Sequence, residues 1–369
     1  MALDPETRRY LEHFQRKLLR PDFDKWVEHK DFVVRMTGEA GRTMRQRFGP
    51  NFSPYSDALI REYEKELSDF VPATSYDTAT SHLIFGDIMD QVQRSLQDMQ
   101  RPLQRPVRLA TSTDANPSPA SVPSQEEHLL FIGEGTSFFC NYWAKFLSHC
   151  LTEGALSSDG PAITAPDMDK FFHERGDLTT IFVELLLHYA FFGHLFGFGV
   201  LIQPAHSLRF RLELLRAMEV FVVGHEFGHF YLEENPRSLD PADPLRQMRL
   251  EEHFCDQFGF IVCRYFGTRT DSWFAFSGAA PLMFLSALRL CENARAHLST
   301  RTAPKDTHPP VDDRIGRILY TALNDTHADN LLAVRGYLEE VGAMWEAMER
   351  IARDIFELAG AQSGESHEV

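Results

Sequence analysis

The sequence predicts a mainly helical protein of the α+β class with one small sheet. Long stretches repeat apolar residues every three or four positions, which is typical of helices that bury one face. Two short runs, 128–132 and 199–203, have the aliphatic content and the flanking glycine or proline of strands. With 369 residues and a hydrophobic content of 43%, the chain is long enough for two domains with packed cores.

The composition of the chain changes twice along its length. Residues 1–104 have charged faces and periodic apolar positions, which predicts an N-terminal helical region. The segment 105–127 is small, polar and proline-bearing, so we expect a linker or a long exposed loop. Apolar density returns at residue 128, and 128–369 is predicted to form a second domain that ends in an amphipathic helix over 331–358.

Four further helices are predicted in the second domain, over 138–151, 167–192, 208–233 and the region around 249–260. The third of these is expected to end at the Asn-Pro pair that follows it. Its first turns carry charged side chains that we expect to form an ordinary solvated face, namely Arg209, Arg211, Glu213 and Arg216.

One segment, 181–202, approaches the length and apolarity of a membrane span. It contains Glu184 and His188, four residues apart, and several glycines. We therefore expect a buried core helix in which those two side chains satisfy each other, and membrane association is not expected.

Charge and cysteine content narrow the functional classes. Lysine and arginine total 37 against 53 acidic residues, a formal net charge of −16, which disfavours binding to nucleic acid or anionic lipid. The five cysteines form no CxxC pair and sit among apolar residues, which is typical of reduced thiols. Together with a polar N-terminus that is unlike a secretory signal, this predicts a cytoplasmic protein.

The most informative stretch is His225-Glu226-Phe227-Gly228-His229. In a helix, residues four apart project from the same face, so the two imidazoles can hold one zinc ion. Glu226 follows the first histidine and can take a proton from a water molecule that zinc activates. The alternative is a buried helix whose two histidines bond to backbone or carboxylate groups.

A catalytic zinc ion needs a third protein ligand, and the helix predicted around 249–260 offers one. Glu252 and Asp256 lie four apart and share a face, so Glu252 can ligate zinc while Asp256 accepts the spare N–H of a ligand histidine. Glu251 competes with Glu252 for this role, and the spacing to Asp256 favours Glu252.

A third element begins at His308, followed by two prolines and two aspartates that suit the first turn of a helix. One interpretation is a well-capped helix start. The other places His308 near the zinc ion, where it would stabilise the oxyanion that forms when water attacks a carbonyl, and lets Arg314 support the site or pair with a carboxylate.

These three elements, in this order, resemble the gluzincin metallopeptidases, and most closely the CAAX prenyl endopeptidase and HtpX-type branch. The resemblance covers about residues 210–320 and implies a zincin-like domain. It implies that His225, His229 and Glu252 bind zinc and that Glu226 is the general base. It also implies that Asp256 orients His225. The branch has several membrane-spanning helices, whereas this chain has one candidate, so the broader gluzincin class is the expectation.

The expected function is zinc-dependent endopeptidase activity on a protein or peptide, with His308 polarising the carbonyl and the segment 199–203 pairing with extended substrate. One alternative is a non-catalytic interaction or regulatory protein on a zincin-like scaffold. Another is a di-iron carboxylate protein, since Glu226 and His229 also form Glu-x-x-His. Such a site needs a second Glu-x-x-His, which the sequence lacks.

Overall fold

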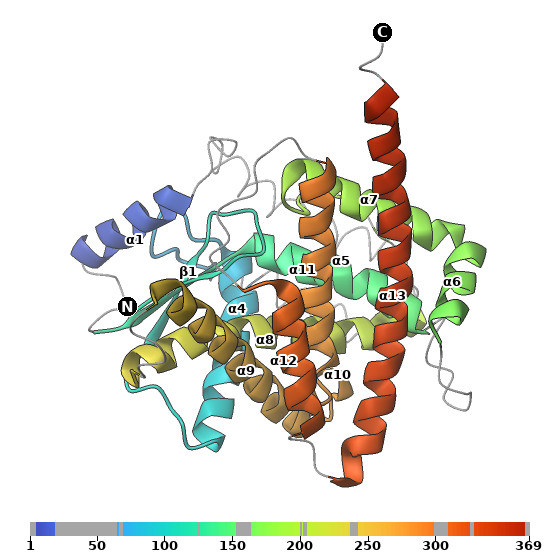
Figure 1. The fold of residues 1–369 in the computed structure, drawn as a ribbon. Coiled ribbons are helices and arrows are strands. Elements are labelled where there is room, and N and C mark those ends of the chain that lie inside the picture. The colour runs from blue at the N-terminus through green and yellow to red at the C-terminus, as the bar shows by residue number, and fades with distance from the viewer. Residues whose placement is uncertain are drawn as a thin grey trace. The chain divides into compact units, whose positions relative to one another are not determined.

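The structure of the protein, a computed structural model, describes residues 5–18, 65, 69–123, 126–152, 164–199, 201, 205–236, 243–298, 309–324 and 328–365. Most of these residues are helical and one three-stranded sheet accompanies them (Figure 1), so the expectation of a mainly α protein with a small sheet is confirmed. The chain groups into two compact units. Unit 1 comprises Met1–Asp87 with Arg105–Ser137, and unit 2 comprises Ile88–Gln104 with Phe138–Val369.

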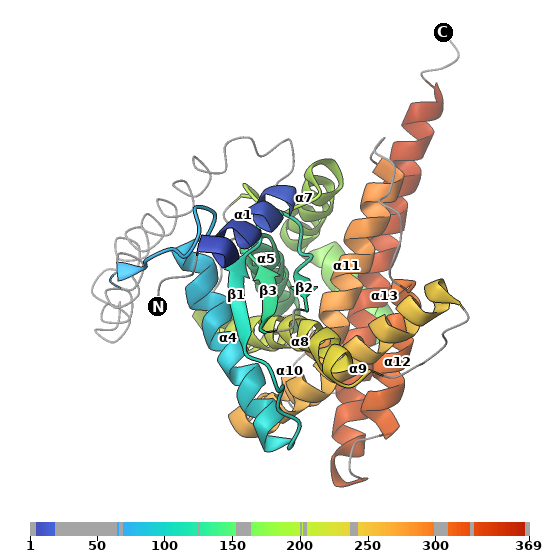
Figure 2. The same cartoon turned by 90° about the vertical axis from the view of Figure 1, so that its left-hand side faces the viewer.

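Unit 1 contains the sheet, in the order β1-β3-β2. The strands are β1 (Val107–Thr111), β2 (Ala120–Val122) and β3 (His128–Ile132). The central strand β3 runs parallel to β1 and antiparallel to β2 (Figure 2). The predicted strand at 128–132 is confirmed, and all five of its residues are buried.

Helix α1 (Pro5–Leu18) covers one face of this sheet. Leu11 packs into a cluster with Ala110, Leu129 and Phe131, and the ring of Phe14 stacks on that of Phe131 at 4.6 Å between centroids. Leu129 and Phe131 alternate along β3, so they point to the same face of the sheet. The helix is thus held on the sheet by apolar burial.

A buried polar network also fastens α1 to unit 1. The side-chain amide of Gln15 donates to the carboxylate of Asp77 and to the carbonyl of Thr111, each at 3.0 Å. The hydroxyl of Thr74 donates to the amide oxygen of Gln15 at 2.8 Å. Gln15 is fully buried, so these bonds replace the water that its amide loses.

The expectation of a linker or loop over 105–127 is wrong in part, because β1 and β2 lie within it. These strands are short and built largely from small or polar residues, which resemble loop composition when only the sequence is read. Residues 19–64 of the predicted N-terminal helical region are outside the described part of the chain. The division into domains at 104 and 128 stays a prediction.

Two helices contain a boundary between the units, α4 (Ala79–Asp98) and α5 (Glu134–Cys150). The remaining α-helices belong to unit 2, and Figure 1 labels them: α6 (Ala165–Glu174), α7 (Gly176–Phe192), α8 (Leu208–Glu234), α9 (Pro244–Thr270), α10 (Trp273–Phe276), α11 (Ala279–Leu298), α12 (Val311–Asn324) and α13 (Ala328–Glu365).

The single helix predicted over 167–192 is two helices, α6 and α7, which meet at Arg175. Helix α6 starts with a capping box in which Thr164 and Asp167 exchange hydrogen bonds. The expected strand at 199–203 is not present at Gly199 and Leu201, and its other residues are outside the described part. The strand expected to pair with substrate is therefore absent at Gly199 and Leu201.

Aromatic packing fills the core of unit 2. Trp143 on α5 is fully buried and its ring faces those of Phe146, Phe182 and Trp345, which lie on α5, α7 and α13. Phe139, one turn before Trp143, faces Phe284 on α11. One face of α5 therefore joins three other helices, and large buried rings of this kind contribute strongly to stability.

Arg289 on α11 links the last three helices. Its guanidinium pairs with Asp312 in the first turn of α12 and with Glu349 on α13. Helix α11 also packs against both α12 and α13, and α12 contacts α13 less extensively (Figure 1). The position of α12 thus depends on both of its neighbours.

Helix α7 holds most of the apolar segment 181–202. In the described part of the chain, none of the helices has the length and apolarity needed to cross a membrane. The expected pairing of Glu184 with His188 is wrong: Glu184 is exposed, and a ring nitrogen of His188 bonds to the carbonyl of Phe196 at 2.8 Å. The hydrogen-bond partner of His188 is therefore the backbone that follows α7, whereas the sequence spacing predicted Glu184.

Candidate metal centre

Helices α8 and α9 pack closely against each other because glycines line their contact. A Cβ atom on Gly259 would lie 2.8 Å from the backbone nitrogen of His225 and 2.8 Å from the carbonyl oxygen of Phe221. A Cβ atom on Gly228 would lie 2.9 Å from Cα of Cys255. Such separations are shorter than real Cβ contacts, so glycine is required for the two helices to come this close.

Local sequence features account for the burial of α8 and for the start of α9. Helix α8 is 27 residues long and is buried from Ala217 to Gly228, a run that includes His225, whereas His229 is partly buried. Helix α9 begins at Pro244, and the carboxylate of Asp243 before it accepts hydrogen bonds from the backbone N–H groups of Leu245 and Arg246 at 3.1 and 3.2 Å. Proline at the first helical position with aspartate before it is a strong helix start.

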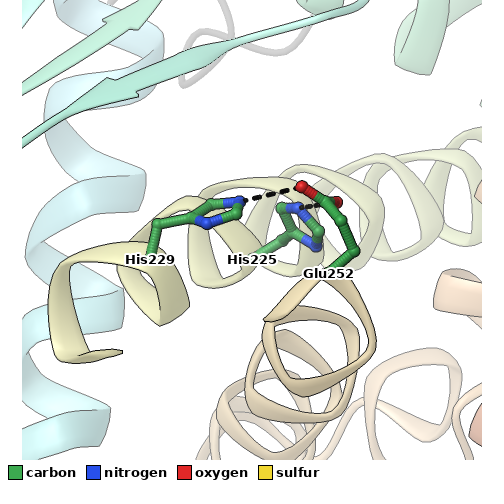
Figure 3. A group of neighbouring side chains, drawn as sticks. All are labelled: His225, His229 and Glu252. Carbon is green, nitrogen blue, oxygen red and sulfur yellow. Dashed lines mark ion pairs between the residues drawn. The ribbon is translucent and has the colours of Figure 1, made fainter. Parts of the chain in front are cut away.

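The predicted ligands converge where these helices meet. His225, His229 and Glu252 each offer a donor atom, and the three atoms lie within 4.8 Å of one another. Glu252 reaches from α9 to both rings on α8, with 3.4 Å between its Oε2 and Nε2 of His225 and 3.6 Å between its Oε1 and Nε2 of His229 (Figure 3).

These separations fit a small cation. Ligand atoms bonded to tetrahedral zinc at about 2.0–2.1 Å stand about 3.3–3.4 Å apart, close to the two nitrogen–oxygen distances here. Two imidazoles and one carboxylate are also the ligand set of one class of catalytic zinc site. A metal ion needs at least three histidine, cysteine, aspartate or glutamate side chains close together. Among the described residues, His225, His229 and Glu252 form such a group.

Asp256 fixes the orientation of the His225 ring. Its Oδ1 lies 3.0 Å from Nδ1 of His225, so Nδ1 carries the hydrogen and Nε2 faces Glu252. Burial opposes the charged imidazolium, but hydrogen bonds to Asp256 and Glu252 outweigh it and raise the pKa of His225 to about 10. Because Asp256 holds the Nδ1 hydrogen, Nε2 facing Glu252 is the nitrogen that would lose its proton when a metal ion binds.

Arg314 in turn holds Asp256. Its Nε and Nη2 each donate to a different carboxylate oxygen at 2.7 Å, which is the two-pronged geometry of a strong arginine–carboxylate pair. Both side chains are buried. Burial opposes ionisation of Asp256, but Arg314 and His225 outweigh it and hold the pKa of that carboxyl well below its usual range. A chain of contacts thus runs from α12 through α9 to α8.

Glu226 lies on α8 beside the donor cluster and is 6% exposed. Its charge acts on His225 and on Cys255, which places its carboxylate in the same region of the structure. A carboxylate next to a metal site and almost out of water is suited to accept a proton from a reacting water molecule. The burial of Glu226 is therefore compatible with the role of a base.

The structure brings together six of the seven residues that the sequence singled out: Glu226, His225, His229, Glu252, Asp256 and Arg314. Of the two competing acids, Glu252 faces the histidines, whereas Glu251 accepts a hydrogen bond from Gln247 at 2.5 Å. His308 is outside the described residues, and Pro309 after it is buried before α12 begins.

Two features of this region were not predicted. The close approach at Gly228 and Gly259 was missed, although small residues four apart in two neighbouring helices are a signal for it. The expectation of a solvated face before the motif is wrong for Arg211 and Arg216, which are partly buried, while the side chain of Arg209 is 84% exposed as expected. Arg211 contacts Asn141 on α5, which is distant in sequence.

Comparisons of the chain with models of known protein families, with curated proteins and with solved structures find no match. The interpretation of the site therefore depends on its own residues and their geometry.

Proposed function

We propose that the chain is a zinc-dependent endopeptidase of the gluzincin class with a zincin-like domain, in which His225, His229 and Glu252 hold the ion. The observation that carries the proposal is the convergence of their donor atoms within 4.8 Å, with Glu226 beside them. The oriented His225 ring adds support, because hydrogen bonding of the second ring nitrogen is common among histidines that ligate metals.

The residues divide the proposed reaction between them. When bound, zinc supplies Lewis acidity, which lowers the pKa of a water molecule towards neutrality and polarises the carbonyl of a peptide bond. Glu226 accepts the proton of the attacking water and later returns it to the departing amine. Asp256 and Arg314 keep His225 in one tautomer and one orientation throughout. His308 is proposed to donate to the oxyanion.

A peptide or protein is the proposed substrate, and the cytoplasm is the proposed location. Five cysteines are buried and unbridged, which suits a reducing compartment.

The test of the reaction is Glu226→Gln, which keeps the size of the side chain and removes its basicity. We expect it to abolish cleavage of a peptide library while zinc content and thermal stability stay as in the wild type. Glu233→Gln, at an exposed position of the same helix, is the matched control and should cleave normally. Cleavage by the Glu226→Gln protein at the wild-type rate would refute the role of this residue.

Metal analysis of the purified protein tests the cofactor. One zinc per chain is expected, and its loss in His229→Ala would assign it to this site. Iron in place of zinc would favour the di-iron alternative. Zinc without hydrolysis of any peptide would favour a non-catalytic interaction protein on the same scaffold.

A further inference from the structure

A cluster of positive charge lies at the junction of α5 and α8. Lys145 on α5 and Arg211 on α8 are both partly buried, and the charge of Arg211 acts on that of Lys145. Arg216 follows Arg211 on the same helix and is also partly buried. Partial burial of several cations together is unfavourable unless an anion compensates them. It is unexpected in a chain whose net charge is −16.

The contacts of Lys145 and Arg211 leave donors unused. The Nη2 of Arg211 donates to the side-chain oxygen of Asn141 at 2.6 Å, but its Nε is buried and has no acceptor within the described residues. The ammonium of Lys145 lies 5.5 Å from the ring centroid of Tyr142. Within the described part of the chain, no carboxylate forms an ion pair with either cation.

Glu219 is the acidic side chain that acts on the arginines, and it compensates them poorly. It is 4% exposed, and the charges of Arg216 and Arg211 act on it. Burial raises the pKa of Glu219 to about 8, and the two arginines offset this only in part. At neutral pH its carboxyl is therefore mostly protonated. Burial and the charge of Arg211 lower the pKa of Lys145 to about 8, so both Lys145 and Arg211 carry positive charge at neutral pH.

We propose that Lys145 and Arg211 bind the oxyanion group of a small ligand, a phosphate or a carboxylate, at the junction of α5 and α8. The planar guanidinium suits the paired oxygens of these groups, and the lysine adds a second positive charge. The buried Nε of Arg211 is the donor that such an oxyanion would satisfy.

This site is separate from the metal centre. Arg211 precedes His225 by fourteen residues on the same helix, which corresponds to about 21 Å along its axis. The proposal therefore does not depend on the proposed peptidase activity, and either can fail without the other.

The test is titration of the full-length protein with inorganic phosphate and, separately, with acetate. Sodium chloride keeps the ionic strength constant, and calorimetry and thermal melting report binding. We expect Lys145→Met and Arg211→Met to weaken oxyanion binding by at least about tenfold, since each removes a charged hydrogen-bond partner. Arg209→Met, at an exposed position of α8, is the matched control and should bind as the wild type does.

The two arms identify the ligand chemistry. Binding of phosphate alone assigns a phosphate ligand, and binding of acetate as well assigns a carboxylate. The charge-conserving Lys145→Arg and Arg211→Lys proteins guard against misfolding and should still bind. The proposal is overturned if neither anion binds or stabilises the protein more than chloride does. It is also overturned if both methionine variants bind the anion as the wild type does, which is the result expected for an anion held at the metal centre.

Discussion

The contact between α8 and α9 can be tested with one methyl group at Gly259. In Gly259→Ala, the new Cβ would stand 2.8 Å from two backbone atoms of α8, whereas ordinary contact begins at 3.4 Å. The helices must therefore separate by about 0.6 Å at this point. Backbone atoms cannot rotate away as a side chain can, so the strain has no local release.

Two opposing effects determine how much Gly259→Ala changes the free energy of unfolding. Overpacking a close contact costs about 1–3 kcal/mol, and alanine in place of glycine in a helix returns about 1 kcal/mol. A net loss of up to about 2 kcal/mol in the free energy of unfolding is expected. Because Glu252 lies on α9 and both histidines on α8, the same displacement should also weaken metal binding.

Urea unfolding measures the stability of Gly259→Ala, and competition with a coloured chelator measures its zinc affinity. Gly316→Ala is the matched control, because no atom lies within 4 Å of the added Cβ and the residue is also helical. That variant should be as stable as the wild type or up to about 1 kcal/mol more stable, with unchanged zinc affinity. Equal behaviour of the two variants would refute the argument from close packing.

Three further substitutions test other parts of the structure. Asp256→Asn leaves the buried Arg314 without its counter-charge, so we expect a loss of about 3–5 kcal/mol in denaturant unfolding and a 10–100-fold weaker zinc affinity by chelator competition; unchanged values would contradict the support proposed for His225. Glu219 has a pKa raised from 4.5 to about 8, so its contribution to stability is complete below pH 4.5 and is lost as pH rises through 8. Glu219→Gln should remove that loss, and melting curves from pH 4 to 9 should show the variant gaining on the wild type as pH rises; parallel curves would exclude the effect. Leu11→Ala opens the core between α1 and the sheet and should cost about 2–5 kcal/mol by urea unfolding, whereas a change below 1 kcal/mol would mean that α1 contributes little to unit 1.

Much of the candidate metal site was predictable, because it depends on the spacing of residues within single helices. Two histidines four apart must share a face of any helix that contains them, and the spacing from Glu252 to Asp256 works in the same way. The choice between Glu251 and Glu252 also followed from spacing. The extent of α8 was close to the predicted 208–233, because asparagine and proline mark its end. Helix α9 is much longer than the predicted region around 249–260, since it runs from Pro244 to Thr270.

The parts that sequence reasoning missed depend on contacts between distant segments. The strands β1 and β2 consist largely of small or polar residues, and only pairing with β3 distinguishes them from a loop. Arg211 is partly buried and donates a hydrogen bond to Asn141 on α5, a contact that the local pattern of charged residues cannot reveal. The role of Gly259 likewise appears only once its partner at His225 is known.

Arg289 gives the C-terminal helix a part in the chemistry proposed for the protein. Arg289 pairs with Asp312 and so restrains the start of α12. Two residues after Asp312, Arg314 binds Asp256, the carboxylate that orients the ring of His225. Truncation of α13 would remove Glu349 and one of the two restraints on Arg289. If the proposed activity is correct, a chain shortened before α13 should keep every side chain of the candidate site and still lose activity.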